Sequence, residues 1–241
     1  MRLDGKDVVL IDTPGFDDTE KSDVEILELL AKNLSLTYEA GKLLHGIILL
    51  QPITTTRFTG SEAKRTRLFK KICGEDAFSH VVIASTFWEE AGNKVRAESL
   101  EKERIRDGDF WGKMLSHGAT AVRHMNTEAS AHGIIRKLLS KQPVALQLQE
   151  ELHNNGGALR RTQAGVQLHS DLDEVSKKLL AEMEQTRRDN ALSKQEMQDE
   201  IRELSVKLQE MQDQKRELES KQVRVRDLIM DVLLGLFDRL T

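Results

Sequence analysis

The sequence predicts an α/β protein whose mostly parallel sheet is followed by a long helical extension. Short apolar runs alternate with helix-like segments over the first 142 residues, which is typical of a parallel sheet with helices on both faces. After Pro143 the chain has no proline and no strand-like run, and from Leu168 onward Glu, Lys, Gln, Arg and Leu dominate. We therefore expect an α/β domain at residues 1–142 and a helical extension at residues 143–241.

The α/β domain is expected to begin with a hairpin and then to alternate strands with helices. Arg2-Leu3 followed by Asp4-Gly5 indicates the end of a strand and a tight turn. Apolar runs predict buried strands at residues 8–12, 46–50, 80–85 and 119–124, and Pro52 ends the second. Helices are expected from an N-cap at Asp23, from Ser61 to about Gly74, and at residues 129–140, because apolar residues there recur at helical spacing.

The helical extension carries one strong break signal and a partial heptad seam. Asn154-Asn155-Gly156-Gly157 is the strong break, and Gly165 is a weaker one. Spacings of three and four predict a coiled coil over about residues 168–237. Its seam residues are Ile201, Leu204, Leu208, Met211, Leu218, Val225, Ile229 and Val232. Two interpretations stay open: the helix associates with itself or with a coiled-coil partner, or it folds back on the globular part.

Composition excludes several classes of protein. The formal net charge is −4, so the basic face that nucleic-acid binding usually requires is not indicated. The single cysteine, Cys73, excludes an intramolecular disulfide framework and fits a reducing compartment, so we expect a cytoplasmic protein. The sequence contains no run of about 18 apolar residues, so we expect no membrane-spanning helix. The histidines show no metal-ligand spacing with cysteines or with one another.

The segment Val8-Val9-Leu10-Ile11-Asp12-Thr13-Pro14-Gly15-Phe16 is the strongest candidate for a functional motif. A β-branched apolar run ends in an acid, and Pro14 and Gly15 then form a turn. A buried parallel strand of this kind delivers a carboxylate and a free backbone N–H to the carboxyl edge of a sheet, where open α/β folds bind ligands. The alternative is a strand-end acid that caps the next turn.

A series of further segments makes the resemblance of this chain to a known family specific. Asp12-Thr13-Pro14-Gly15-Phe16-Asp17-Asp18-Thr19 resembles the third GTPase motif of the septin-like P-loop GTPases, which include the immunity-associated (GIMAP) and chloroplast Toc GTPases, and it is most similar to their fungal branch. Matching pieces follow in order at residues 46–50, 53, 57–61, 69–74, 81–89, 111–114, 126–131, 147–150 and 162–165.

The resemblance implies a guanine-nucleotide site with Mg²⁺. Asp12 would hold a Mg²⁺-bound water, and the Gly15 amide would contact the γ-phosphate. Thr86-Phe87-Trp88-Glu89 stands at the guanine-recognition motif, where Glu89 offers two acceptors to the base and Phe87 replaces a lysine whose stem packs over it. Asn126 lies near the fifth motif. The alternative for residues 86–89 is an ordinary strand-to-helix connection. The alternative for Asn126 is a turn residue without a role in binding.

The motifs expected for catalysis and phosphate binding are missing from this series. Phe16 follows the glycine where Ras-like enzymes have the glutamine that orients the attacking water, and phenylalanine cannot do so. We therefore assign no catalytic residue, although Arg57 is a candidate for a group supplied to a partner protomer. Only seven residues precede Val8, and none resembles the Gly-x-x-x-x-Gly-Lys-[Ser/Thr] phosphate loop.

The family fold places the phosphate-loop strand between the strand at Val8 and the strand at Gly46. We therefore expect a GTPase-type sheet that lacks its first strand, in an incomplete version of a longer protein. The expected function is a guanine-nucleotide-binding, GTPase-like module with assembly through the coiled coil. The missing phosphate loop argues against ordinary nucleotide binding by the chain alone. The alternative is a non-catalytic scaffold in which the helical extension binds a partner.

Overall fold

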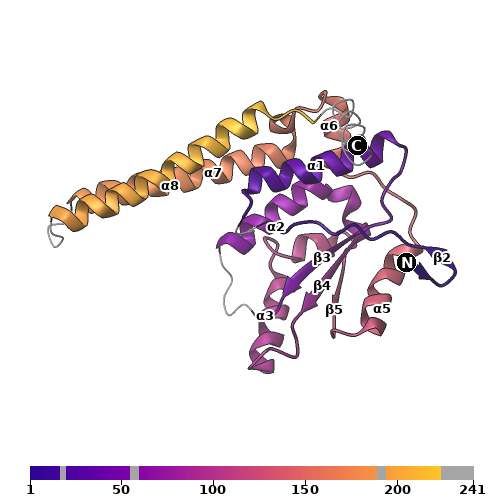
Figure 1. Ribbon diagram of the computed structural model, residues 1–241. Coiled ribbons are helices and arrows are strands. Elements are labelled where there is room, and N and C mark those ends of the chain that lie inside the picture. Colours follow the sequence, from indigo (N-terminus) through magenta and orange to yellow (C-terminus); the bar gives the residue numbers. More distant parts are fainter. Residues whose placement is uncertain (17–19, 55–59, 189–193, 224–241) are drawn as a thin grey trace, which may run out of the picture. The chain divides into compact units, whose positions relative to one another are not determined.

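The computed structural model describes residues 1–16, 20–54, 60–188 and 194–223 (Figure 1). They divide into two compact units. The α/β unit comprises Met1–Gly15 and Asn33–Glu150, and the helical unit comprises Phe16–Lys32 and the described part of Glu151–Thr241. The helical unit thus includes a segment from the first part of the chain, which the sequence-based domain bounds assign to the α/β domain.

Three parallel strands form the sheet of the α/β unit. They are β3 (Ile47–Pro52), β4 (Val81–Thr86) and β5 (Thr120–Arg123), in the spatial order β3-β4-β5. The register pairs Pro52 with Thr86 and Ser85 with Arg123. The prediction of an α/β fold with a parallel sheet is confirmed, and three of the four predicted buried strands are present.

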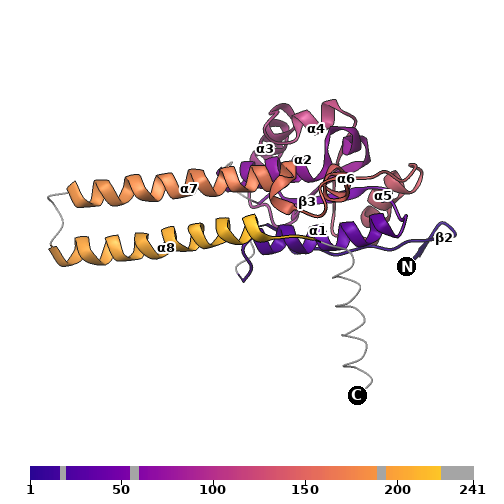
Figure 2. The same cartoon turned by 90° about the horizontal axis from the view of Figure 1, so that it is seen from above.

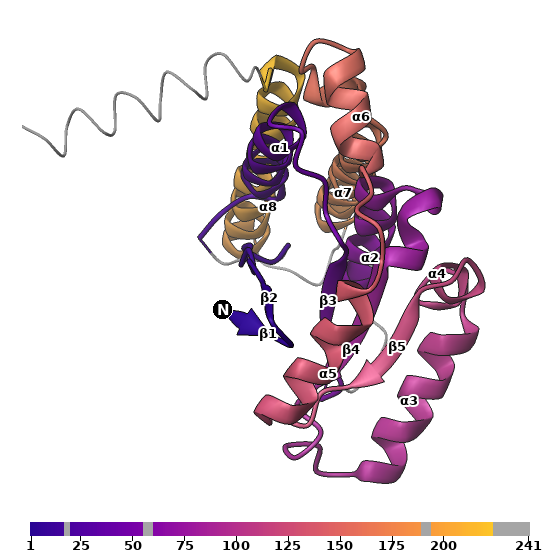
Figure 3. The ribbon, with the colours of Figure 1, turned by 90° about the vertical axis from the view of Figure 1, so that its right-hand side faces the viewer.

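Helices cover both faces of this sheet (Figure 3). On one face, α2 (Gly60–Cys73), the 3₁₀ helix η1 (Glu75–His80) and α4 (Gly112–Ser116) supply a core that includes Phe78, Trp111 and Met114. On the other, Ile134 and Leu138 of α5 (Glu128–Leu139) pack against Val82 and Ala84. Helix α3 (Lys94–Arg106) also belongs to this unit and is not among the predicted helices.

Cys73 at the end of α2 lies in the first of these cores. Its side chain is 1% exposed, and burial raises the pKa of the thiol far above its usual range. The interpretation of Cys73 as a small buried apolar residue near a helix end therefore agrees with the structure.

A two-stranded hairpin opens the chain, as expected. Strands β1 (Arg2–Leu3) and β2 (Lys6–Asp7) are antiparallel, and Asp4 and Gly5 both have positive φ, as a type I′ turn requires. Helix α5 holds this hairpin, because Arg136 donates to both Asp4 carboxylate oxygens at 2.7 and 3.0 Å and Lys6 Nζ donates to the Leu139 carbonyl.

The predicted strand at residues 8–12 is wrong. Within the described residues, this segment belongs to no strand, and Val9, Leu10 and Ile11 are 84%, 57% and 55% exposed. Its apolar pattern is that of a buried strand, but a strand needs a neighbour to accept its backbone hydrogen bonds. The sheet ends at β3, and β1 and β2 lie on the β3 side of it without joining its ladder (Figure 3).

Helix α1 (Asp23–Glu39) has the predicted cap, Asp23, as its first residue, so its cap lies one residue earlier than expected. Ser22 is the capping residue: its Oγ accepts from the Glu25 amide at 3.2 Å, and the Glu25 carboxylate accepts from the Ser22 amide at 2.7 Å. This reciprocal pair is a capping box. The hydrogen bonds from Ser22 lower the pKa of Glu25.

Two long antiparallel helices dominate the helical unit (Figure 2). They are α7 (Gln163–Arg188) and α8 (Lys194–Ser220), preceded by α6 (Gln147–Asn154) and the 3₁₀ helix η2 (Leu159–Arg161). The predicted seam positions up to Leu218 are buried or half-buried in α8, and Leu168 and Leu172 are buried in α7. Ion pairs of Asp173 with Lys215 and of His169 with Glu219 also link the two helices. Seam residues Val225, Ile229 and Val232 lie outside the described residues.

The predicted break at Asn154-Asn155-Gly156-Gly157 is confirmed, since α6 ends at Asn154 and both glycines have positive φ. Gly165 is not a break, because it lies within α7. A Cβ at Gly165 would come within 2.1 Å of the Leu159 carbonyl, so glycine there permits close packing of α7 on η2. Among the described residues, no helix is long and apolar enough to cross a membrane.

Gly157 provides a test of the close packing between the break after α6 and the segment after α8. A Cβ at Gly157 would lie 2.1 Å from the Val223 carbonyl, and its φ is +85°, whereas a Cβ at Gly156 (φ +70°) would meet nothing within 4 Å. In denaturant unfolding, Gly156→Ala should cost about 1 kcal/mol through its backbone alone. Gly157→Ala should cost more, by at least about 1 kcal/mol. Equal losses would contradict the close approach of residue 223.

Candidate functional site

The carboxyl edge of the sheet is the candidate functional site, since parallel α/β sheets bind ligands at this edge. Strand β3 ends at Pro52, β4 at Thr86 and β5 at Arg123. Because Ser85 pairs with Arg123, the segments that follow β4 and β5 leave the sheet side by side. Thr86, the last residue of β4, and Glu89 and Asn126 in these segments are three of the residues predicted to bind nucleotide.

The loop after β4 alternates buried and exposed residues. Thr86 is half-buried and its carbonyl accepts from the Ile53 amide at 3.0 Å. Phe87 is 51% exposed and has φ +62°, in the left-handed region that bulky side chains disfavour. Trp88 is buried, while Glu89 is exposed. An exposed aromatic ring thus stands beside an exposed carboxylate in the sequence.

A polar network lies beneath this loop. Trp88 Nε1 donates to Ser85 Oγ at 2.9 Å, and Ser85 Oγ donates to Glu101 of α3 at 3.1 Å. Arg123 donates to the other Glu101 oxygen through Nε and Nη2, at 2.9 and 2.5 Å. Its guanidinium also lies 4.0 Å from the centre of the Trp88 ring. The hydrogen bonds to Glu101 raise the pKa of Arg123.

The segment after β5 turns sharply into α5. Asn126 is exposed with φ +50°, and the next residue, Thr127, is the N-cap whose side chain accepts from the Ser130 amide. Ser130 Oγ lies 2.7 Å from His124 Nδ1 and accepts from the Met125 amide. These contacts shape the turn, and the Asn126 side chain is left on the surface.

Asp12 and Gly15 are the remaining predicted site residues. Both are exposed and outside regular structure, and a Cβ at Gly15 would meet nothing within 4 Å. A single exposed carboxylate fits a contact to Mg²⁺ through water, because Mg²⁺ keeps several waters and takes few protein ligands. The described residues contain no cluster of three or more His, Cys, Asp or Glu that could hold a metal ion. Asp17, Asp18 and Arg57 lie outside the described residues.

A buried ion pair fixes the carboxyl end of β3. Arg104 of α3 lies 2.9 Å from Glu62 of α2, with side chains 1% and 5% exposed. Arg104 also donates to the Pro52 carbonyl at 3.3 Å and lies over the Trp111 ring at 5.7 Å. This one side chain therefore connects β3, α2, α3 and the start of α4.

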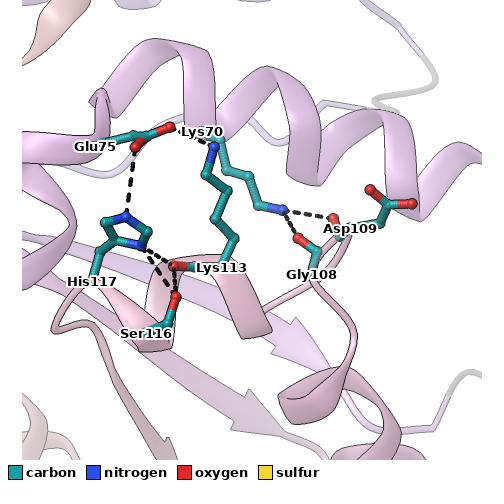
Figure 4. Close-up of polar contacts among 7 residues, drawn as sticks. All are labelled: Lys70, Glu75, Gly108, Asp109, Lys113, Ser116 and His117. Carbon is teal, nitrogen blue, oxygen red and sulfur yellow. Dashed lines mark hydrogen bonds and ion pairs between the residues drawn. The ribbon is translucent and has the colours of Figure 1, made fainter.

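A second polar cluster lies at the opposite edge of the sheet (Figure 4). Lys70 Nζ donates to the Gly108 and Asp109 carbonyls at 2.6 and 2.8 Å, and burial lowers its pKa. Glu75 pairs with Lys113, whose hydrogen bond lowers the pKa of Glu75, and lies 3.6 Å from His117. Glu75 precedes β4 and His117 precedes β5, so this cluster is at the amino ends of the strands. We interpret it as structural, because it connects α2 with the segment before α4 and η1 with α4.

Comparison of the chain with protein-family models and with curated proteins finds no match.

The residues that shape the loop after β4 are not among those predicted from the sequence. Ser85, Glu101 and Arg123 form its network, although Ser85 and Arg123 lie within segments predicted as strands. A charged residue at the end of a buried strand is a signal that could have identified Arg123, since a charge there requires a partner. Glu101 gave no signal, because α3 is rich in charged residues throughout.

Phe87 provides a test of strain at the site. Asparagine tolerates left-handed backbone better than phenylalanine, so Phe87→Asn should raise the free energy of unfolding by up to about 1 kcal/mol. Val95→Asn is the matched control, because Val95 is 79% exposed on helical backbone and should change stability by less than about 0.5 kcal/mol. Chemical denaturation would measure both. Destabilisation by Phe87→Asn would show that the ring contributes more through packing than its backbone costs.

Proposed function

We propose that this chain is a guanine-nucleotide-binding module of the P-loop GTPase type, and that the carboxyl edge of β4 and β5 recognises the base. One observation carries the proposal. Residues 86–89 and Asn126 are far apart in sequence, yet the parallel β4–β5 register places their segments next to one another. These are the two segments that the family resemblance assigns to the base.

Each residue has a distinct role in this proposal. The exposed Phe87 ring would stack on the base, and the Glu89 carboxylate would accept hydrogen bonds from its polar edge. Asp12 would orient a water bound to Mg²⁺, and the Gly15 amide would face phosphate. Phe16 has no polar atom to orient an attacking water. Binding rather than hydrolysis is therefore the activity proposed for this chain.

The gap beside β3 bears on the phosphate end of the site. The family fold has a strand there that leads into the phosphate loop, and residues 8–12 do not occupy it. In this proposal the described residues contribute the contacts to the base and to the Mg²⁺-bound water. We therefore expect selectivity for guanine over adenine.

Titration with fluorescent mant-GDP and mant-GTP, with and without Mg²⁺, tests this function. Glu89→Ala should weaken binding about 10- to 100-fold, the usual effect of losing hydrogen bonds to a charged group. Asp12→Ala should abolish the Mg²⁺ dependence and leave the Mg²⁺-free affinity unchanged. Glu90→Ala is the control, because it removes a neighbouring carboxylate that has no role in the proposed site.

Two outcomes would contradict the proposal. If the wild-type protein shows no saturable binding of either nucleotide, the α/β unit is not a nucleotide-binding module. Equal affinity for mant-ADP and mant-GDP would remove the assigned role of Glu89.

A second function, as a scaffold, is favoured by the α7–α8 hairpin. The described positions of the predicted α8 seam are buried or half-buried within the chain, so association would have to use other positions of the hairpin. Leu180 of α7 and Val206 of α8 are 48% and 56% exposed. Self-association, or binding of a coiled-coil protein, through this surface remains our proposal for the helical unit.

Sedimentation velocity over a range of concentrations tests the scaffold function. A Leu180→Glu, Val206→Glu double variant should raise the dissociation constant of the assembly at least about tenfold, since each buried aliphatic side chain contributes about 1.5–3 kcal/mol. Val95→Glu is the matched control on an exposed valine of the α/β unit. A wild-type chain that stays monomeric throughout would contradict self-association.

A further inference from the structure

Arg123 occupies a position that its strand alone does not explain. It is the last residue of β5, and its side chain is 42% exposed, yet it contacts two other elements at once. Two of its nitrogens bond Glu101 of α3, its third lies 3.5 Å from Glu98, and its flat face covers Trp88 in the loop after β4. An exposed arginine on the surface usually makes contacts worth little, whereas this one is held in a single planar geometry.

The loop after β4 depends on these contacts for its conformation. Trp88 is held from below by Ile53 and Ala97, at its indole N–H by Ser85, and on its face by Arg123. With Trp88 fixed on one side and Thr86 fixed in the sheet on the other, Phe87 is forced into its left-handed conformation. Phe87 in this conformation is 51% exposed. Strain of this kind persists only where the surroundings over-determine the backbone.

We propose that Arg123 is a positioning residue for the base-side loop: by pairing with Glu101 and stacking on Trp88, it holds Phe87 outward as a platform for a planar aromatic ring. This inference rests on the proposed nucleotide-binding function for its ligand. The positioning itself is a property of the free protein. Without Arg123, Trp88 keeps its apolar neighbours but loses the cover on its face, and Phe87 relaxes from its strained backbone conformation.

The first measurement is fluorine NMR of the full chain labelled with 5-fluorotryptophan. The protein has two tryptophans, and Trp88→Phe assigns their signals. Arg123→Ala should shift and broaden the Trp88 signal and leave that of the fully buried Trp111 unchanged. Arg123→Lys keeps a charge for Glu101 but has no planar group to stack, so its Trp88 signal should lie between those of wild type and Arg123→Ala. Arg106→Ala, which removes an exposed arginine at the end of α3, should change neither signal.

The second measurement is the mant-GDP affinity of the same variants. If the binding-competent loop falls to about a tenth of the population, Arg123→Ala should weaken binding about tenfold, and Arg106→Ala should not. A Trp88 signal that is unchanged in Arg123→Ala would overturn the inference, as would unchanged affinity. If wild-type protein binds no nucleotide, the proposed function fails, and the Trp88 signal alone then decides whether Arg123 orders the loop.

Discussion

The burial of β4 from Val81 to Ser85 is the constraint on which the α/β unit depends. Val81, Val82, Ile83, Ala84 and Ser85 are each at most 1% exposed. Strand β4 has a parallel neighbour on each side and a separate apolar core on each face. Its backbone groups and side chains are therefore satisfied in every direction, and the strand has no freedom to shift in register. The ends of β3 and β5, and the loops that follow them, are placed by pairing with this strand.

The polar groups of the unit follow from the same constraint. The Ser85 hydroxyl is buried, so it needs a protein partner, and the Pro52 carbonyl at the end of β3 also bonds a side chain. Arg104 and Glu101, both on α3, supply these partners. Helix α3 has few apolar residues, and two of its buried residues are the charged ones that serve the sheet edge. Its position is set by ion pairs and hydrogen bonds as well as by packing, which explains how so charged a helix belongs to the core.

The elements predicted correctly from the sequence are those whose pattern is local. The β-branched runs of β3 and β4, the Asp4-Gly5 turn and the glycine break after α6 each depend on neighbouring residues. Residues 8–12 show why the same pattern fails elsewhere, since an apolar run forms a strand only if another strand adjoins it. The apolar seam of α8 could be predicted from the sequence. The face of α7 that packs against it could not, because Thr186 and Ser176 interrupt the apolar spacing there. At the candidate site, Thr86, Glu89 and Asn126 came from family resemblance, whereas the Glu101–Arg123 pair is a tertiary contact for which only Arg123, a charge at a strand end, gave a sequence signal.

The buried thiol of Cys73 makes the local opening of the α/β unit measurable by chemical modification. The thiolate is the reactive form of cysteine, and this sulfur is both covered by the core beneath α2 and held protonated by burial. An alkylating reagent therefore reacts only during excursions in which that core opens. Since Cys73 is the chain's single cysteine, the rate of modification reports the opening free energy of one defined face of the sheet. The helical unit has no cysteine among its residues and contributes no background to that rate.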